Sequence, residues 1–536
     1  LHVRSRRQRQ MCIRDRQKIV PLAKQNDVPV AFYSKEDPPN FDVFAGLAKS
    51  VDFIFTSAIE VVRKYQKLTN EATPATALPF SVNFAHHNPL GSMRSDLTEF
   101  VFGGSWHRKK YQARRRAGGL IFDGILKTGH PLWIVDRNLE IGAEKYLYPE
   151  KYLQHLHGPL SHDALLAIQR LLPVSVNLNS VHASQTMFAN RVVELQAMGT
   201  CIVSNYSAGV NTQFPNVFMP DREIDMVQWL ENLSLEDIRK AQIDGVRNAF
   251  TDNTNFDRVR EMLEFCGFEV SANEPQVFIE GLNNDEFANF VAEQKTGLAL
   301  KQSTEMTSHE AEGRYVTLHV DASKEHDPHF VDDLVNGFKY SSARTVVSKD
   351  KYEGTYEVAP EREHLVKAGE YAEIHGVPTS DPGVLKIPAN QLVASRNRCV
   401  QPEITVSEYD LTVVVPIYNN GRHLYYKCFD SLRRSSIFNK MKVLLVDDGS
   451  TDFETRQIVK RLVAGYPNVE AFYHEIGGSG SASRPRNTGL ELCDTKFITY
   501  LDPDNEAISD GFAELLKMIE ETGVNSVSYT HLTLPT

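Results

Sequence analysis

Short apolar runs alternate with stretches of helical periodicity along most of this 536-residue chain. In the last quarter the expected strands are 411–416, 442–446, 469–473 and 497–501, with helices near 421–434, 452–464 and 485–493. Apolar runs of this length are typical of parallel strands that are buried on both faces. Ligands bind such sheets beyond the carboxyl ends of the strands. We therefore predict a functional site where polar residues follow these runs.

The first half of the chain shows the same alternation twice. Strands are expected at 28–33, 51–56 and 77–80, and a second series at 100–102, 132–135, 174–178 and 201–204. Helical patterns lie between them, and two more close the segment at 221–249 and 255–265. Two successive arrays of this kind indicate twin Rossmann-like domains, which we place at 17–97 and 98–270.

Residues 271–407 carry a weaker pattern. The acidic stretch 274–312 is interpreted as a linker with one helix, followed by a strand at 315–320 and a helix at 330–340. We interpret Asp332 and Asp333 as acidic residues that stabilise the N-terminus of this helix, rather than as ligands of a metal. The region is expected to be a small α+β connector to which the sequence assigns no chemistry.

Composition narrows the class of protein. Hydrophobic residues make up 41% and charged residues 24%, as in ordinary globular proteins, and the formal net charge is −11. An acidic chain is a poor general binder of nucleic acid, so we expect no such partner. The six cysteines are scattered, which favours a reducing cytoplasm. No apolar run approaches the roughly 20 residues that span a bilayer. We expect membrane association only through segments absent from this sequence, peripherally at the inner face.

Both ends differ in composition from the rest of the chain. Residues 1–16 contain six Arg and lack a starting Met, and the uncharged residues 527–536 fit no element. Both segments resemble translated sequencing-adapter read-through, so we interpret the chain as a fragment cut at both ends. A nuclear-localisation or nucleic-acid-binding arm is the alternative for the basic head.

Four polar motifs follow or open the elements expected at 408–526. They are Pro416-Ile-Tyr-Asn419, Asp447-Asp-Gly-Ser450, Arg484-Pro-Arg-Asn487 and Asp502-Pro-Asp504. Two carboxylates at i and i+2 beyond a strand can share a hard divalent cation, which neutralises a leaving diphosphate. The alternative for this last motif is an acidic turn before a helix. Arginine forks suit phosphate oxygens, although a solvated helix start is our preferred interpretation of Arg484.

The order and spacing of these motifs resemble family 2 glycosyltransferases of the GT-A fold. The resemblance implies that Asp502 and Asp504 hold Mg²⁺ or Mn²⁺, that Asp502 also contacts the sugar nucleotide, and that Asp448 binds an imide edge of the base. The resemblance also implies that the rest of the sugar nucleotide, namely its nucleobase, ribose and diphosphate, is contacted by Pro416, Tyr418, Asn419, Arg486 and Asn487. The family's catalytic base is expected beyond the end of this chain, so the catalytic residue is unknown.

Residues 17–270 resemble a different group, the family 1 and family 4-like glycosyltransferases of the GT-B fold, especially the spore-maturation type. The pattern Arg-x-x-Glu-x-x-Ala-x-Gly begins at Arg191. The resemblance implies that Glu194 and Arg191 belong to a donor site, with Glu194 on the ribose. It also implies that Ser105 and Trp106 cradle a diphosphate, without a cofactor. The alternative for Arg191 and Glu194 is a surface ion pair of one helix.

Together the two resemblances imply an α/β protein with GT-B-like twin Rossmann domains followed by a truncated GT-A domain. The implied reaction moves a sugar from a nucleotide-diphosphate donor, expected to be a UDP-sugar, to a glycan, polyol-phosphate or lipid-linked acceptor. The implied setting is the synthesis of bacterial cell-surface polysaccharide. Two alternatives remain: a sugar nucleotidyltransferase, and a non-catalytic scaffold that binds sugar nucleotides.

Overall fold

The computed structural model describes residues 15–93, 99–270, 274–349, 356–359, 370–376, 384–388 and 409–523. The predicted foreign tail at 527–536 lies outside the described residues, as do all but two residues of the predicted head at 1–16 and large parts of the predicted connector. The chain divides into two compact units. The first comprises residues 1–119, 131–219 and 238–274, and the second comprises 120–130, 220–237 and 275–536.

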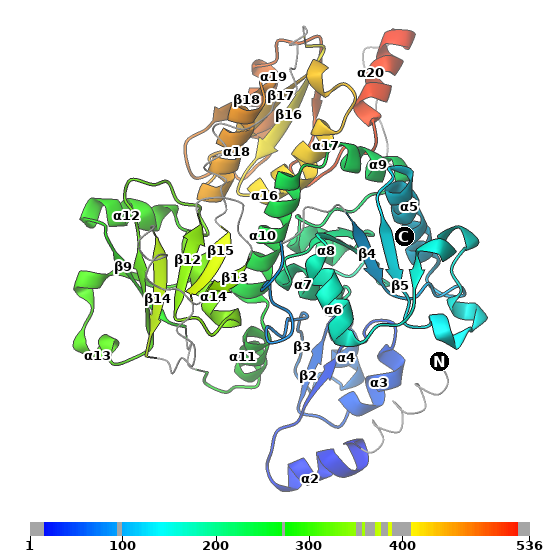
Figure 1. The fold of residues 1–536 in the computed structure, drawn as a ribbon, viewed down its shortest axis with the longest axis vertical. Coiled ribbons are helices and arrows are strands. Elements are labelled where there is room, and N and C mark those ends of the chain that lie inside the picture. The colour runs from blue at the N-terminus through cyan, green and yellow to red at the C-terminus, as the bar shows by residue number, and fades with distance from the viewer. Residues whose placement is uncertain are drawn as a thin grey trace. The chain divides into compact units, whose positions relative to one another are not determined.

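A small parallel sheet opens the first unit (Figure 1). Its strands run in the order β1 (Ala31–Ser34), β2 (Phe53–Thr56) and β3 (Ala75–Ala77), with α3 (Phe41–Ala48) and α4 (Ile59–Leu68) between them. Val61 and Tyr65 of α4 share a buried core with Ile54 of β2. Each strand overlaps one that the sequence predicts.

A second parallel sheet of the first unit has five strands in the order β6-β5-β4-β7-β8. They are β4 (Phe100–Gly103), β5 (Leu132–Val135), β6 (Leu156–His157), β7 (Val174–Asn177) and β8 (Cys201–Ser204). The main helices of this part of the chain are α5 (Gln112–Lys127), α6 (His162–Leu171), α7 (Arg191–Ala197), α9 (Glu223–Asn232), α10 (Leu235–Asp252) and α11 (Asn255–Phe265). The sequence predicts every strand except β6, because two residues are too few to form a periodic pattern.

Residues 276–388 contain a mixed sheet of seven strands in the order β10-β9-β11-β14-β12-β15-β13. The strands are β9 (Gln276–Glu280), β10 (Leu300–Gln302), β11 (Tyr315–His319), β12 (Thr345–Lys349), β13 (Glu357–Ala359), β14 (Tyr371–His375) and β15 (Val384–Pro388). The helices include α12 (Asn284–Glu293), α13 (Ser308–Ala311) and α14 (Phe330–Tyr340). Asp332 and Asp333 lie in the first turn of α14, as predicted.

The interpretation of 274–312 as a linker with one helix is wrong. This stretch contributes two strands of the seven-stranded sheet, and β9 pairs in parallel with both β10 and β11. It also contains two helices, α12 and α13. The reason is that β9 holds only three apolar residues, Val277 to Ile279, and its burial depends on partners that lie elsewhere along the chain.

The C-terminal part of the second unit is a parallel sheet of four strands in the order β18-β17-β16-β19. The strands are β16 (Leu411–Ile417), β17 (Met441–Asp447), β18 (Val469–Tyr473) and β19 (Phe497–Tyr500). The helices are α16 (Gly421–His423), η7 (Leu424–Phe429), α17 (Asp430–Arg433), η8 (Phe438–Lys440), α18 (Phe453–Gly465), α19 (Ser483–Glu491) and α20 (Gly511–Thr522). Every residue of β16 and β17 is buried, and all pairs of this sheet are parallel, which confirms the predicted α/β fold with parallel strands.

The two central strands end at the same level, because Ile417 at the end of β16 pairs with Asp447 at the end of β17. The loops that follow them therefore begin at one edge of the sheet. Helix α19 lies directly on β16, since a side-chain carbon at Gly489 would overlap the side chain of Val414. This close approach brings the N-terminus of α19 toward the same edge.

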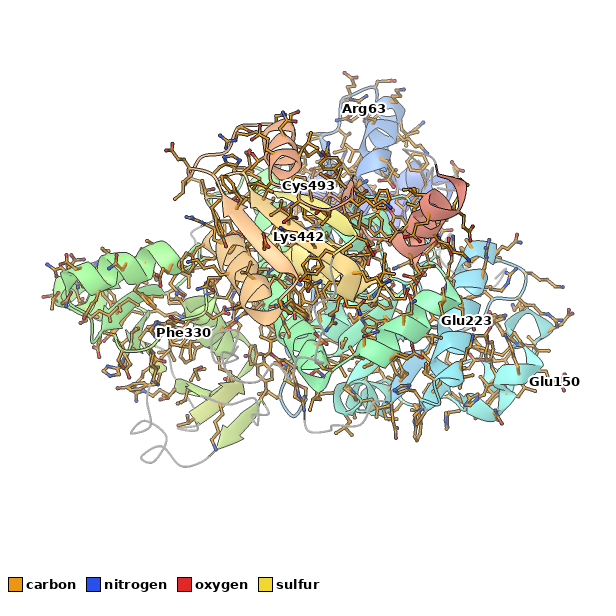
Figure 2. The ribbon with its side chains drawn as sticks, turned by 90° about the horizontal axis from the view of Figure 1, so that it is seen from above. Arg63, Glu150, Glu223, Phe330, Lys442 and Cys493 are labelled. Carbon is orange, nitrogen blue, oxygen red and sulfur yellow. The ribbon has the colours of Figure 1, made fainter. Side chains whose placement is uncertain are left out.

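A buried cation marks the opposite, amino-terminal edge of this sheet. Lys442, at the start of β17, is labelled in Figure 2. Its ammonium nitrogen lies 3.1 Å from a carboxylate oxygen of Asp494 and 3.2 Å from one of Glu470. Asp494 comes just before β19. It therefore lies at the amino-terminal edge of this sheet, away from the carboxyl ends of the strands.

Candidate functional site

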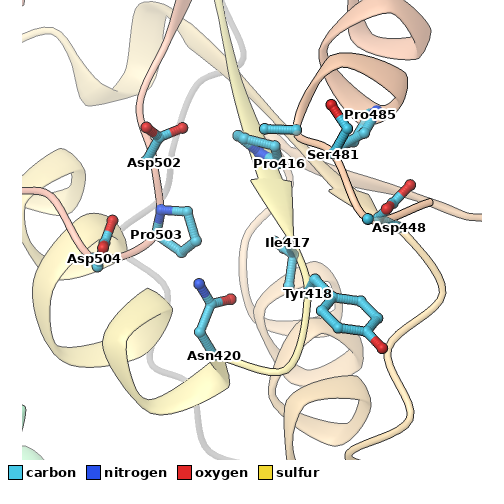
Figure 3. Close-up of a pocket in the computed structure, with 12 residues that line it drawn as sticks. Pro416, Ile417, Tyr418, Asn420, Asp448, Ser481, Pro485, Asp502, Pro503 and Asp504 are labelled. Carbon is cyan, nitrogen blue, oxygen red and sulfur yellow. The ribbon is translucent and has the colours of Figure 1, made fainter. Parts of the chain in front are cut away.

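The loops that follow β16, β17 and β19, together with the start of α19, surround one cavity of about 380 Å³ (Figure 3). We call it the C-terminal cavity. It lies where the sequence predicts a site, beyond the carboxyl ends of parallel strands. Its lining consists of Pro416, Ile417, Tyr418, Asn420, Asp448, Gly480, Ser481, Ala482, Pro485, Asp502, Pro503 and Asp504.

The sharp turn after β17 brings Asp448 to this cavity. Gly449 has a φ of +84°, and a side-chain carbon there would overlap the carbonyl oxygen of Glu475, so only glycine fits. The neighbouring Asp447 is fully buried, and its carboxylate accepts a hydrogen bond from the backbone N–H of Ser450, 2.8 Å away. This backbone geometry turns the next carboxylate, that of Asp448, into the cavity.

Asp448 is held by three donors. Its Oδ2 accepts hydrogen bonds from the backbone nitrogen of Ser479 at 2.8 Å and from the Ser479 hydroxyl at 2.7 Å. Its Oδ1 accepts one from Nε of Arg484 at 2.6 Å. Burial by itself would raise the pKa of the Asp448 carboxyl, but these bonds outweigh it and lower the pKa below its ordinary value. Asp448 therefore remains a carboxylate at neutral pH.

The preferred interpretation of Arg484 as a solvated helix start is wrong. Besides its bond to the carboxylate, its Nη2 donates to the backbone oxygen of Asp448 at 3.0 Å. The local sequence gives no sign of this contact, because it depends on how closely α19 approaches the loop after β17. Arg484 is thus a site residue that sequence reasoning undervalued.

Tyr418 and Asn419 follow β16 but lie differently. Tyr418 is 44% exposed and lines the cavity. Asn419 is not among the lining residues, and its φ is +53°. Its amide nitrogen donates to the hydroxyl of Thr451 at 2.9 Å, and its amide oxygen accepts from the backbone nitrogens of Thr451 and Asp452. The side chain of Asn419 therefore ties the loop after β16 to the loop after β17.

Asp502 and Asp504 both line the cavity from the loop after β19. A carboxylate oxygen of Asp502 accepts a hydrogen bond from Nη2 of Arg486 at 2.6 Å. The guanidinium of Arg486 also lies 5.9 Å from the centre of the Tyr500 ring. Arg486 and the exposed Asn487 are not among the lining residues. The structure thus brings Arg486 to the predicted metal pair rather than to the cavity wall.

The chemistry of the donor set fits a magnesium or manganese ion. Asp504 has no hydrogen-bond or ion partner among the described residues, and Asp502 keeps one carboxylate oxygen beyond its bond to Arg486. Mg²⁺ is commonly held by one or two carboxylates together with waters and substrate phosphates. Within the part of the chain that the structure describes, no cluster of three or more His, Cys, Asp or Glu could hold a metal. A cation here would depend on ligands from the substrate.

Ser105 and Trp106, predicted to cradle a diphosphate, are only 4% and 7% exposed. The Ser105 hydroxyl lies 3.4 Å from a carboxylate oxygen of Asp136. The Trp106 ring packs against Tyr148, with 5.3 Å between the ring centres. Both side chains are therefore part of the packed interior of the first unit.

Arg191 and Glu194 have separate partners in the first unit. The guanidinium of Arg191 donates to the backbone oxygen of Gly103. A carboxylate oxygen of Glu194 accepts a hydrogen bond from the side-chain nitrogen of Asn190 at 2.6 Å. Glu194 is half-buried, and its predicted role toward ribose stays a prediction.

Comparison with known proteins shows what the C-terminal segment is similar to. Residues 412–532 match Glycosyl transferase family 2, which confirms the predicted resemblance over that segment. A stretch of 96 residues is 30% identical to the poly(ribitol-phosphate) beta-N-acetylglucosaminyltransferase TarP of Staphylococcus aureus and covers 18% of this chain and 28% of TarP. The structure of S. aureus TarS 1–349 in complex with UDP is 25% identical over 23% of this chain and 38% of that chain, with a TM-score of 0.20.

The N-terminal region is similar to a different structure. The apo structure of OtsA is 12% identical over 47% of this chain and 70% of that chain, with a TM-score of 0.33. The chain spans less than half the length of TarP and of the UDP-bound TarS chain. Among the described residues, no helix combines the length and the apolar character needed to cross a membrane.

Proposed function

We propose that the C-terminal domain binds a nucleotide-diphosphate sugar and transfers the sugar to an acceptor hydroxyl. The observation that carries the proposal is the convergence of Asp448, Asp502 and Asp504 on one cavity. These carboxylates come from two loops that are far apart in the sequence, and both loops follow parallel strands. A packed core has no need of three acidic side chains around one cavity.

The nucleoside end of the ligand would lie against Tyr418 and Asp448. An ionised carboxylate accepts hydrogen bonds, and the imide N–H of uracil is a suitable donor. Because Arg484 and Ser479 hold Asp448 in its charged form, this acceptor is present before the ligand binds. The partly exposed ring of Tyr418 offers a surface on which a base or ribose can pack. UDP-sugars are therefore the proposed donors.

The diphosphate would lie at Asp502 and Asp504. Magnesium or manganese bound there would offset the negative charge that develops on the leaving diphosphate. Arg486 donates to Asp502, so it fixes one carboxylate and adds a positive charge close to the phosphates. Asn487 and Asn419 would support these loops, and Pro416 forms part of the cavity wall.

The acceptor is proposed by similarity to TarP, whose name specifies poly(ribitol-phosphate). A glycan, a polyol-phosphate or a lipid-linked acceptor of bacterial cell-surface polysaccharide synthesis fits this relationship. No catalytic base is assigned among the described residues. The cytoplasmic setting, the domain boundaries and a donor site at Arg191 and Glu194 stay predictions.

Calorimetric titration of UDP into the full chain, with and without Mn²⁺, tests this proposal. We expect binding that Mn²⁺ strengthens by at least tenfold, and we expect Asp502→Ala to abolish this effect of Mn²⁺. Asp494→Ala is the matched control, because it removes a carboxylate from the opposite edge of the same sheet and should leave UDP affinity unchanged. A folded protein that binds no UDP, or equal losses in the two variants, would reject the assignment. Mn²⁺-dependent UDP binding without transfer or hydrolysis of any UDP-sugar would favour the scaffold alternative.

A further inference from the structure

Asn420 is a lining residue of the C-terminal cavity. It directly follows Asn419 and precedes α16. In Figure 3 its side chain rises beside Ile417, with the amide nitrogen turned toward Pro503 and Asp504. Neither amide atom forms a hydrogen bond with any described residue, and the amide oxygen is buried.

The neighbouring Asn419 differs in this respect. Both amide atoms of Asn419 are used in bonds between loops. Buried polar groups in folded proteins almost always have partners, so an unpartnered amide oxygen beside a cavity calls for an explanation. A ligand that enters the cavity is one such explanation, since it would supply the missing partner.

From this geometry, and resting on the proposed function, we infer that Asn420 recognises the sugar portion of the donor. It lies at the Asp502–Pro503–Asp504 end of the cavity, whereas Asp448 lies across it (Figure 3). The sugar is joined to the diphosphate, so it is the part of the ligand that reaches beyond the proposed metal pair. The amide therefore faces the sugar and its link to the diphosphate rather than the base.

The chemistry of an amide suits a sugar hydroxyl. An asparagine side chain carries two N–H donors and one oxygen acceptor. Phosphate oxygens can only accept, and would leave the amide oxygen unpartnered. A hydroxyl both donates and accepts, and the N–H of an acylamino sugar donates. Because no hydrogen bond to a described residue fixes this amide, it can turn so that its oxygen as well as its nitrogen meets such groups. Asn420 is thus a residue that discriminates among donor sugars.

The test compares UDP with UDP-sugars in the full chain, with Mn²⁺ present. For Asn420→Ala, we expect affinity for the preferred UDP-sugar to fall about fivefold to tenfold, the range of one or two neutral hydrogen bonds. Affinity for UDP itself should change less than twofold, because UDP lacks the sugar. The melting temperature should not fall, because the side chain makes no hydrogen bond with any described residue. Asn439→Ala, an exposed asparagine just before β17, is the matched control and should leave both affinities unchanged.

The outcomes separate this inference from the proposed function. If the wild-type chain binds UDP, but Asn420→Ala lowers UDP and UDP-sugar affinity equally, the contact is to the nucleotide and the sugar assignment is overturned. If neither affinity changes, Asn420 does not touch the ligand and the inference is overturned while the donor site stands. If the wild-type chain binds no UDP, the proposed function fails first and the inference fails with it.

Discussion

Nη2 of Arg486 lies 2.6 Å from a carboxylate oxygen of Asp502, so the arginine expected on a diphosphate is bonded to the predicted metal pair. This ion pair gives Arg486 two opposite effects on the site. It competes with a cation for one oxygen of Asp502, and it keeps a positive charge close to where a diphosphate would lie.

Arg486→Met should therefore move two affinities in opposite directions. Removal of the competing guanidinium should strengthen binding of Mn²⁺ alone about twofold to threefold, since each partner of this pair is partly exposed and the pair is screened. Loss of the positive charge should weaken UDP binding about fivefold to tenfold. Calorimetric titrations of Mn²⁺ and of UDP measure both changes. A parallel loss of both affinities would mean that Arg486 acts only by holding the loop.

The bond between Arg484 and Asp448 predicts a shift in pH dependence. The pKa of Asp448 lies below its ordinary value of 3.8, so its charged form and the contacts it makes are present above that pH and are lost as the pH falls through the lowered pKa. In Arg484→Met fewer donors offset the burial of Asp448, so the pKa of its carboxyl should rise. UDP binding should then be lost at a higher pH than in the wild type. Arg484→Lys should restore part of the difference.

UDP affinity measured from pH 3.5 to pH 7 for the three proteins checks this prediction. An identical acid limb in the wild type and in Arg484→Met would show that Asp448 does not control binding.

Gly449→Ala should disrupt the turn after β17. The residue has a φ of +84°, and a side-chain carbon would overlap the carbonyl oxygen of Glu475. We expect a loss of about 1–3 kcal/mol in the free energy of unfolding, together with weaker UDP binding, because Asp448 belongs to the same turn. Gly511→Ala is the control, since a side-chain carbon at Gly511 would meet no atom within 4 Å. Urea unfolding monitored by fluorescence distinguishes the two. Equal stability of both variants would contradict this account of the turn.

A metal ion should bind this chain tightly only in the presence of nucleotide. The candidate site offers two carboxylates, and the described residues hold no larger metal-binding cluster. The remaining ligands must come from water and phosphate oxygens. The paramagnetic signal of free Mn²⁺ should fall little on addition of the protein and strongly when UDP is also added. Tight binding without UDP would show that further protein ligands exist.

The sequence predicts the strands that carry this site well, because β16 and β17 are apolar at almost every position and their burial needs no information from elsewhere. It predicts Asp448 through its place after β17, and Asp502 and Asp504 through their place after β19. It does not predict that Arg484 binds Asp448 or that Asn419 joins two loops, because both contacts depend on the approach of segments about 30 residues apart.

The N-terminal half shows a second limit of sequence reasoning. Ser105 and Trp106 follow a Gly-rich turn after β4, and the sequence does not show that both are buried among aromatic and polar partners; their role toward a diphosphate stays a prediction. Similarly, β9 and β10 escape prediction because short strands with mixed polarity are stabilised by their neighbours in the sheet.

Hydrogen exchange by mass spectrometry of the full chain, with and without UDP and Mn²⁺, tests the central claim most directly because it locates the ligand. Our account predicts slower exchange in four segments that surround the C-terminal cavity, at 416–421, 447–451, 479–486 and 501–505. Protection confined to the region of Glu194, or no protection of a protein that binds UDP, would contradict it.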